Sequence, residues 1–300
     1  MALMHAFARV APRSLVVVAT FDHGTGPSAT KAASLVRAAA AGLGFRTVVG
    51  RAAVPGTSEA EWRAARREFL RGVADRTDGV ITTAHTADDQ VETVLIRVLR
   101  DSGARGLAGL YATSDVIRPL LGFSRARVAA YARAVGAEWV EDPTNASSRF
   151  LRNRVRYDLL PALTAMRPEL PAELLDLARR AASWRSSLDA VTEANVRLRA
   201  DGSSLAVATA DLAAYSRTEL AVLWPALAAR VGLAMDWRGT ERAAAFTNRS
   251  RTGARIQLSG GWEIARSREL FELRRWKSQG IGKREEGKGL TATAGTGGNR

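Results

Sequence analysis

Two kinds of hydrophobic pattern alternate along the first 135 residues of the chain. Short apolar, β-branched runs are typical of buried strands, and longer segments with apolar residues three or four positions apart are typical of helices. Strands that alternate with helices predict an α/β fold, in which helices cover both faces of a parallel sheet. The predicted strands are residues 14–21, 45–49 and 79–83, and the predicted helices are residues 29–43, 58–75, 86–100 and 124–135.

The pattern changes after residue 153. It stays helical to about residue 198, and a break is expected at residues 201–203. Two further helices and three short strands follow, with a tight turn at Gly260-Gly261, which predicts a small α+β domain. The tail is rich in Gly, Lys and Thr and is predicted to be disordered. The expected divisions are an α/β domain at 1–165, a helical linker at 166–200, the small domain at 201–275 and the tail at 276–300.

The composition of the 300 residues excludes several classes of protein. Apolar residues make up 46% and charged residues 25% of the chain, which is typical of a globular protein of two domains. The longest apolar runs, such as residues 15–19, are far shorter than the roughly 20 residues that cross a bilayer. The chain has no cysteine, which excludes disulfides, thiolate catalysis, iron–sulfur clusters and cysteine-ligated zinc.

The charge balance favours a polyanionic partner. Lys and Arg number 44 and Asp and Glu 30, so the formal net charge is +14 at pH 7. Much of the positive charge is arginine, whose planar guanidinium suits phosphate, and nucleic acid is the commonest partner of such a chain. The alternative is a GC-rich genome, which raises the arginine and alanine content of all its proteins.

Four side chains suited to catalysis gather where the third predicted strand meets the helix that follows it. His85 precedes this helix, and Asp88, Asp89 and Glu92 lie in its first two turns, with Asp88 and Glu92 on one face. Two acids and an imidazole at the carboxyl end of a strand suit the binding of Mg²⁺ or the positioning of a nucleophile. The alternative is that Thr86 and Asp89 cap the helix, which accounts for one or two carboxylates but leaves His85 and Glu92 unexplained.

The end of the first predicted strand carries Asp22, His23 and Gly24. Gly and Ser residues follow and lead into a helix, whose N-terminus is a natural anion site. An Asp-His pair by itself is more often structural, and the spacing fits no phosphate-loop or dinucleotide fingerprint.

Arginines gather after an acidic turn at residues 141–145. Four arginines fall within eight residues there, and this density suits the phosphate groups of ATP or of nucleic acid. The alternative is an exposed basic helix. The residues concerned are Arg149, Arg152, Asn153, Arg154 and Arg156, and a weaker cluster is formed by Arg63, Arg66 and Arg67.

Together these motifs resemble the tRNA(Ile)-lysidine synthetase family of the N-type ATP pyrophosphatase superfamily. The resemblance is strong over residues 1–165 and weaker to about residue 275. Its motifs, in order, are Asp22-His23-Gly24, residues 85–93, Arg105-Gly106-Leu107-Ala108-Gly109, Arg118-Pro119-Leu120-Leu121, residues 141–145 and Arg152-Asn153-Arg154.

The resemblance implies an activity, two cofactors and partners. Members adenylate C2 of the wobble cytidine of tRNA(Ile) with the CAU anticodon, using ATP and Mg²⁺, and free L-lysine then displaces AMP to form lysidine. It also implies a cytoplasmic enzyme without membrane contact. It leaves the oligomeric state open, and a homodimer is one of the alternatives.

The resemblance further implies roles for individual residues. The small domain at 201–275 would contact tRNA. The catalytic residues would be His85, Asp88, Asp89, Glu92 and Arg66; the nucleotide would be held by Asp22, His23, Gly24, Arg152, Asn153 and Arg154; and Asp89 and Glu92 would bind the metal.

The chain departs from the family in one major respect and, after Gly24 and at Arg67, in smaller ones. The family's Ser-Gly-Gly-x-Asp-Ser phosphate loop is not found, and residues 2–10 have helical spacing with no capping residue before them. We expect a longer protein in which Met1 is internal, and poor ATP binding by the chain as it stands. The alternative is a catalytically inactive tRNA-binding protein. A tRNA thiolase of the same superfamily is disfavoured because the chain has no cysteine.

Overall fold

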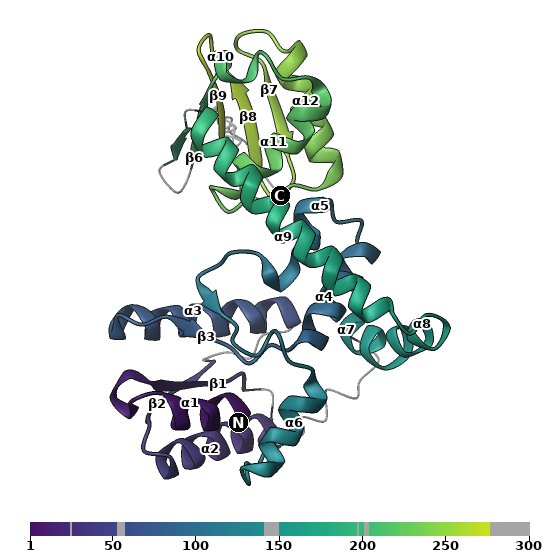
Figure 1. Cartoon of the computed structure of the whole chain (residues 1–300). Coiled ribbons are helices and arrows are strands. Elements are labelled where there is room, and N and C mark those ends of the chain that lie inside the picture. Colours follow the sequence, from purple (N-terminus) through teal and green to yellow (C-terminus); the bar gives the residue numbers. More distant parts are fainter. Residues whose placement is uncertain (25, 53–57, 141–149, 197, 201–203, 277–300) are drawn as a thin grey trace, which may run out of the picture.

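A computed structural model describes residues 1–24, 26–52, 58–140, 150–196, 198–200 and 204–276. It has an α/β part at the N-terminal end and a small C-terminal part, and the long helix α9 runs from one to the other (Figure 1). The predicted tail beyond residue 276 and the acidic turn at residues 141–145 lie outside the described residues. No helix in the described ranges is both long and apolar enough to cross a membrane.

The first layer of the α/β part is a pair of parallel strands with helices beneath it. The apolar side chains of Met4, Ala40 and Phe45 form a small core between the helices and the strands. A single 3-10 turn at Arg13–Leu15 shortens the predicted strand 14–21 at its start. The elements are α1 (Ala2–Val10), β1 (Val17–Asp22), α2 (Pro27–Gly42) and β2 (Arg46–Arg51), with Val17 paired to Arg46 and Asp22 to Arg51.

A second pair of parallel strands lies in the same part of the chain. Helix α3 packs against β1 on the face away from α1 and α2, and it begins where the Ser58 hydroxyl accepts a hydrogen bond from the Glu61 amide. The predicted α/β class, with parallel strands and helices on both faces, is confirmed. In the described residues the two pairs of strands are not hydrogen-bonded to each other. The elements are α3 (Glu59–Thr77), β3 (Ile81–Thr82), α4 (Ala87–Leu99), α5 (Ala104–Leu107), a 3-10 turn (Gly109–Tyr111), β4 (Val116–Ile117) and α6 (Arg125–Ala134).

The segment after residue 150 is helical, as predicted. Its helices are α7 (Leu151–Arg154), a π-helical turn (Val155–Leu159), α8 (Leu160–Met166) and α9 (Leu170–Asn195). Helix α9 packs on α4, where Val91 and Val94 contact Leu174 and Ala178. A bidentate ion pair from Arg105 to Asp189 fastens α5 to the same helix.

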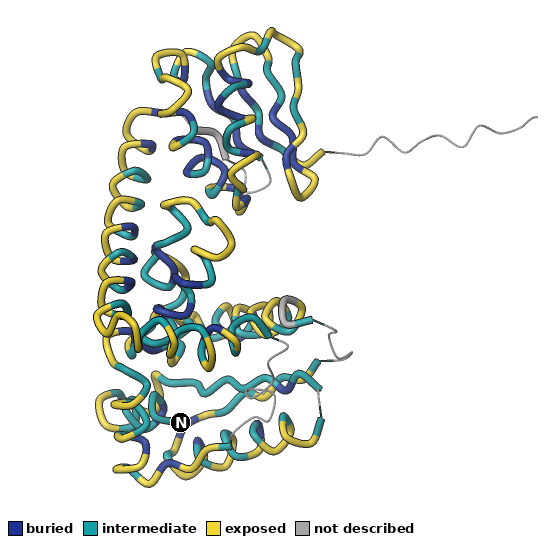
Figure 2. Tube along the Cα trace, turned by 90° about the vertical axis from the view of Figure 1, so that its right-hand side faces the viewer, coloured by how far each residue is buried: buried dark blue, intermediate teal, exposed yellow. Residues whose placement is uncertain are grey.

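The small C-terminal part is a five-stranded antiparallel sheet covered by helices, with strand order β5-β6-β9-β8-β7. Burial is deepest here (Figure 2), around the fully buried rings of Trp224 and Phe271. Two strands at residues 198–200 and 204–208 were not predicted, because they are short and depend on tertiary pairing. The second of them pairs with β9 from the distant end of the chain, and the first pairs with the second. The elements are β5 (Leu198–Ala200), β6 (Ser204–Ala208), α10 (Thr209–Leu212), α11 (Arg217–Ala229), α12 (Trp237–Arg249), β7 (Arg255–Leu258), β8 (Trp262–Arg266) and β9 (Leu270–Arg275).

One buried side chain fixes the loop after α5. The fully buried Gln90 donates to the Ala108 carbonyl oxygen at 3.0 Å and accepts from the Leu110 amide at 2.6 Å. Between these two residues Gly109 has φ +57°, and a Cβ atom there would lie 2.6 Å from the Gln90 Oε1 atom. Glycine is therefore required at this position by both backbone conformation and space.

We expect Gly109→Ala to lower the free energy of unfolding by about 2–4 kcal/mol, because it strains a left-handed residue and displaces a buried hydrogen-bonding side chain. Urea unfolding followed by circular dichroism measures this. Gly122→Ala is the control, since a Cβ atom there would meet nothing within 4 Å. If the two substitutions lowered the free energy of unfolding equally, the requirement for glycine at position 109 would be contradicted.

Candidate active site

The start of helix α4 is held by a reciprocal cap. The Thr86 hydroxyl accepts from the Asp89 amide, and Asp89 Oδ2 accepts from the Thr86 amide at 2.8 Å and from its hydroxyl at 2.8 Å. The structural reading of Thr86 and Asp89 is thus confirmed, but it uses only one oxygen of Asp89. The other oxygen, Oδ1, is 3.0 Å from Arg152 Nη2.

Three arginines surround the Glu92 side chain, which is 1% exposed. Its Oε1 atom accepts from Arg125 Nη2 at 2.8 Å and from Arg156 Nε at 2.6 Å. Its Oε2 atom accepts from Arg152 Nε at 2.8 Å and from Arg156 Nη2 at 2.9 Å. The buried Glu92 carboxylate of α4 thus joins four elements, since its partners come from α6, α7 and the π-helical turn.

The cluster as a whole is positively charged. Three guanidinium groups face the two carboxylates of Asp89 and Glu92, which leaves one net positive charge. Burial by itself would raise the pKa of Glu92, but the hydrogen bonds from Arg156 and Arg125 outweigh it and lower that pKa. The pKa of Asp89 is lowered too, since its hydrogen bonds from Thr86 and the charge of Arg152 outweigh burial.

This charge pattern predicts acid sensitivity. A carboxyl whose pKa is lower in the folded state contributes stability above its unfolded pKa and loses it as the pH falls through the folded value. We expect the free energy of unfolding to hold down to the ordinary glutamate pKa of 4.5 and to fall below it. Urea unfolding at a series of pH values measures this. An unfolding free energy that stays constant well below pH 4.5 would contradict the prediction.

The same contacts bear on the predicted metal. The oxygens of Asp89 and Glu92 that would coordinate Mg²⁺ accept hydrogen bonds from guanidinium groups, and a positive cluster repels a cation. Within the ranges described, no group of three or more His, Asp or Glu side chains has the arrangement of a metal site. As arranged, these two carboxylates do not fit a magnesium ion, and the geometry gives no support to the metal role predicted for them.

Asp88 contacts the start of helix α6. Its Oδ2 atom accepts from the backbone amide of Arg125 at 2.7 Å, and the neighbouring Ala87 amide donates to the Phe123 carbonyl oxygen at 2.9 Å. These contacts fix the start of α6, and with it the guanidinium of Arg125 beside Glu92. In this geometry Asp88 is a positioning residue.

His85 lies close enough to Asp89 and Arg152 for their charges to act on it. Its Nδ1 atom is 2.8 Å from the Thr83 hydroxyl. Burial lowers the pKa of His85, and the charges of Arg118 and Arg152 add to this, whereas Asp89 opposes it. The imidazole is therefore neutral at pH 7 and has the protonation state of a general base.

The residues at the end of β1 form a second group, and the charge of Arg66 contributes to the lowered pKa of one histidine in each group, His23 and His85. The buried Asp22 accepts from the Gly24 amide at 2.8 Å and from the Thr30 hydroxyl at 2.9 Å, which ties the strand to helix α2. The hydrogen bond from Gly24 is the main reason that the pKa of Asp22 is lowered. His23 has a buried Nδ1 atom without a hydrogen-bond partner in the part of the chain that is described.

The remaining predicted residues are divided between the two groups. Arg152 belongs to the carboxylate cluster, whereas Arg154, two residues later, is exposed. Asn153 lies in α7 between them. Arg66 is on α3, where its charge contributes to the lowered pKa of His23. Arg149 lies outside the described residues.

Two members of the cluster were given no individual role in the sequence analysis. Arg156 was named there only as one of the grouped arginines, although its helical spacing of four positions from Arg152 places both on one face. Arg125 comes from α6, 33 positions from Glu92, and no local pattern connects the two.

Comparisons with known proteins identify the family of the chain. Residues 1–163 match the sequence profile of a family described as PP-loop domain. The chain belongs to the PP-loop domain family. The fold of this PP-loop protein is similar to that of a U34-tRNA thiolase from Methanococcus maripaludis, with a TM-score of 0.50 and 13% identity over 60% of this chain and 66% of the other.

Several curated relatives are named tRNA(Ile)-lysidine synthase, which confirms the resemblance seen in the motifs. The PP-loop protein is 41% identical to the one from Methylobacterium sp. (strain 4-46), over 64% of this chain and 58% of the relative. It is 33% identical to the one from Solibacter usitatus (strain Ellin6076), over 90% of this chain and 64% of that relative. The chain thus spans less than two thirds of the length of these relatives.

Proposed function

We propose that the protein takes part in forming lysidine on tRNA(Ile), by ATP-dependent ligation of lysine to C2 of the wobble cytidine. The similarity to proteins named tRNA(Ile)-lysidine synthase carries the proposal. The neutral His85 beside a positive cluster in a PP-loop domain supports it. Partners in this proposal are ATP, free L-lysine and the tRNA with the CAU anticodon.

The proposed reaction has two steps. The C2 oxygen of the cytidine attacks the α-phosphate of ATP, and diphosphate leaves. The lysine amine then attacks C2, the C2–oxygen bond breaks, and AMP leaves. His85 takes the proton that the attacking amine loses, and the guanidinium groups around Glu92 stabilise negative charge on phosphate.

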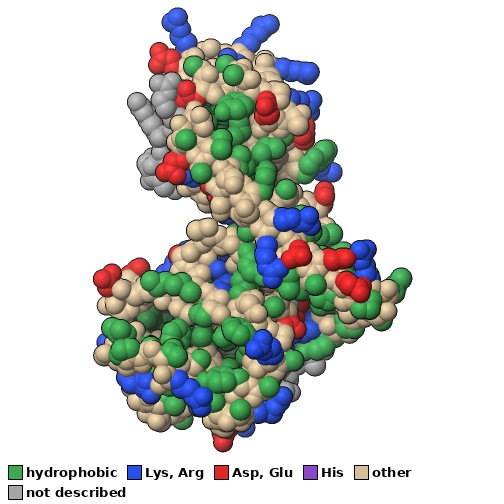
Figure 3. All heavy atoms as spheres, viewed as in Figure 1, with side chains coloured by type: hydrophobic (Ala, Val, Ile, Leu, Met, Phe, Trp, Pro, Cys, Tyr) green, Lys and Arg blue, Asp and Glu red, His purple; other side chains and the backbone are tan. Residues whose placement is uncertain are grey.

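The other predicted residues support these steps. Asp22, His23 and Gly24 hold the nucleotide at the end of β1 and Arg66 faces it from α3, while Asp88 keeps Arg125 in place. Lys and Arg side chains lie on both the α/β part and the C-terminal part of the face shown in Figure 3, which suits the electrostatic attraction of tRNA to both.

The deciding experiment incubates the protein with ATP, L-lysine and unmodified tRNA(Ile), and analyses the nucleosides by mass spectrometry. Because poor ATP binding is expected from the sequence, the ATP concentration is raised until the result no longer changes. Lysidine, with AMP released only when both lysine and tRNA are present, supports the proposal. tRNA binding without lysidine or AMP would overturn it and favour the alternative, a tRNA-binding protein without this chemistry.

A further inference from the structure

Three arginines from three helices gather around a single carboxylate where α4, α5 and α9 meet (Figure 1). Arg105 of α5 makes a bidentate pair with Asp189 of α9, at 2.8 and 3.2 Å. Arg185 approaches the same carboxylate less closely, with its Nε atom 3.9 Å from Oδ2. The third arginine, Arg97 of α4, lies close enough for its charge to act on Arg185. None of the steps proposed above uses this group, which we call the α9 arginine cluster.

The loop between α4 and α5 fixes the position of Arg97. Its Nη1 atom donates to the Gly106 carbonyl oxygen, and the Ser102 amide donates to the Arg97 carbonyl oxygen at 2.9 Å. A Cβ atom at Gly106 would lie 2.9 Å from the Cβ atom of Ser102 and 3.7 Å from Arg97 Nη1, so glycine lets the loop close against the guanidinium. Arg97 is thus attached to the residue that follows Arg105.

The α9 arginine cluster has an excess of two positive charges, because three guanidinium groups share one carboxylate. The side chains of Arg105 and Arg185 are only 14% and 26% exposed. Burial lowers the pKa of the Arg185 guanidinium, the charges of Arg105 and Arg97 lower it further, and Asp189 opposes them. Like charges that are partly withdrawn from water destabilise one another, so an anion that binds among them is favoured.

The guanidinium of Arg185 has unused donors. In the part of the chain that the structure describes it donates no hydrogen bond, and its one ion pair is the long contact with Asp189. The Asp189 side chain is 36% exposed, so solvent reaches this side of the cluster. Figure 3 shows Lys and Arg side chains at the surface where α5 meets α9. An anion can therefore reach Arg185 from solvent.

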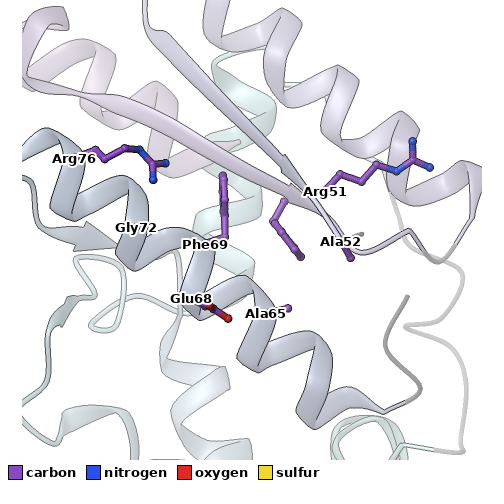
Figure 4. Close-up of a pocket in the computed structure, with 8 residues that line it drawn as sticks. Arg51, Ala52, Ala65, Glu68, Phe69, Gly72 and Arg76 are labelled. Atoms are coloured by element: carbon purple, nitrogen blue, oxygen red, sulfur yellow. The ribbon is translucent and has the colours of Figure 1, made fainter. Parts of the chain in front are cut away.

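Exposed arginines elsewhere in the protein differ in this respect. Arg51 and Arg76 line the hollow beside Phe69, between β2 and α3 (Figure 4). The Arg51 side chain is 70% exposed, and Arg76 is exposed as well. Because water already solvates such guanidinium groups, an anion gains little by pairing with them. The partly buried α9 arginine cluster offers a stronger anion site.

We propose that the α9 arginine cluster binds a phosphate group, which accepts hydrogen bonds from Arg185 and offsets the excess positive charge of Arg97 and Arg105. The oxygens of a phosphate group match the planar fork of a guanidinium. A free inorganic phosphate ion and a phosphodiester in an RNA backbone share this chemistry. The bound group joins α4 and α5 to α9, the helix that runs to the C-terminal part (Figure 1). The proposal does not rest on lysidine formation.

Arg185→Gln tests the proposal, because it removes a charge without breaking a hydrogen bond between described residues. Calorimetric titration with inorganic phosphate, in a chloride buffer of constant ionic strength, measures the affinity. We expect the variant to bind phosphate at least about tenfold more weakly than the wild type, the effect of one lost charge-assisted hydrogen bond. Without phosphate, the variant should unfold at the wild-type temperature or above it, because a repulsion is relieved.

Arg180→Gln is the matched control, since it removes the same charge from an exposed position of α9. It should bind phosphate as tightly as the wild type does. Arg185→Lys keeps the charge and loses the planar fork, so its phosphate affinity should lie between those of the wild type and Arg185→Gln.

Titration with unmodified tRNA identifies the source of the phosphate group. If Arg185→Gln weakens RNA binding and reduces the slope of log affinity against log salt concentration by about one, a backbone phosphate occupies the site. If Arg185→Gln weakens the binding of inorganic phosphate and leaves RNA binding unchanged, the ligand is a free phosphate ion.

Two results would overturn the proposal. One is that the wild-type protein binds neither inorganic phosphate nor RNA more tightly than Arg185→Gln does. The other is that Arg180→Gln weakens binding as much as Arg185→Gln does, since the effect would then come from net charge and not from a site. Because these measurements follow binding and not lysidine formation, neither result bears on the proposed activity.

Discussion

Replacing Glu92 by alanine is expected to lower the free energy of unfolding by about 3–5 kcal/mol, the range for breaking a buried ion pair from one side. Glu92 is 1% exposed and accepts hydrogen bonds from Arg125, Arg152 and Arg156. Without it the three positive charges repel one another with only Asp89 to offset them. Urea unfolding at pH 7 measures the change.

The control for Glu92→Ala is Glu173→Ala. Glu173 pairs with Arg167 at the surface, where both side chains are largely exposed, so its loss should change stability by less than about 1 kcal/mol. Similar values for the two variants would show that the cluster around Glu92 contributes no more than a surface pair. Glu92→Gln keeps the shape of the side chain and loses its charge. We therefore expect it to lower the free energy of unfolding by less than Glu92→Ala and by more than Glu173→Ala.

Replacing His85 by alanine is expected to slow lysidine formation by about 10²–10⁴-fold, the contribution typical of a general base. His85 is held by the Thr83 hydroxyl, and burial keeps it neutral at pH 7. Single-turnover formation of lysidine at saturating lysine measures the rate. His5→Ala, on helix α1, is the control and should leave the rate unchanged.

The pH profile separates a base from a merely structural histidine. Because the pKa of His85 is lowered from 6.5, the wild-type rate should stay constant as the pH falls through 6.5 and decline only below it. In His85→Ala this decline should disappear along with most of the rate. A variant that keeps the wild-type rate, or the wild-type acid limb, would contradict the proposed role.

The cap at the start of α4 illustrates what local sequence can predict. Thr86 and Asp89 are three positions apart, and the reciprocal hydrogen bonds between them follow from helix geometry alone. The grouping of His85, Asp89 and Glu92 at the end of a strand was also predicted, since it needs only a strand, a helix and their order. The role of Asp88 was not, because its partner is the backbone of another helix.

The sequence by itself determined the alternation of strands and helices, the caps and the positive charge, because these depend on residues a few positions apart or on composition. Only the tertiary structure decided which charges meet. It brings Arg125, Arg152 and Arg156 to Glu92 across sequence separations of 33 to 64 residues. It also leaves the space beside Phe69 open, because small residues on β2 and α3 face each other only after folding. Contacts of this kind depend on how helices and strands pack, and no local period in the sequence encodes them.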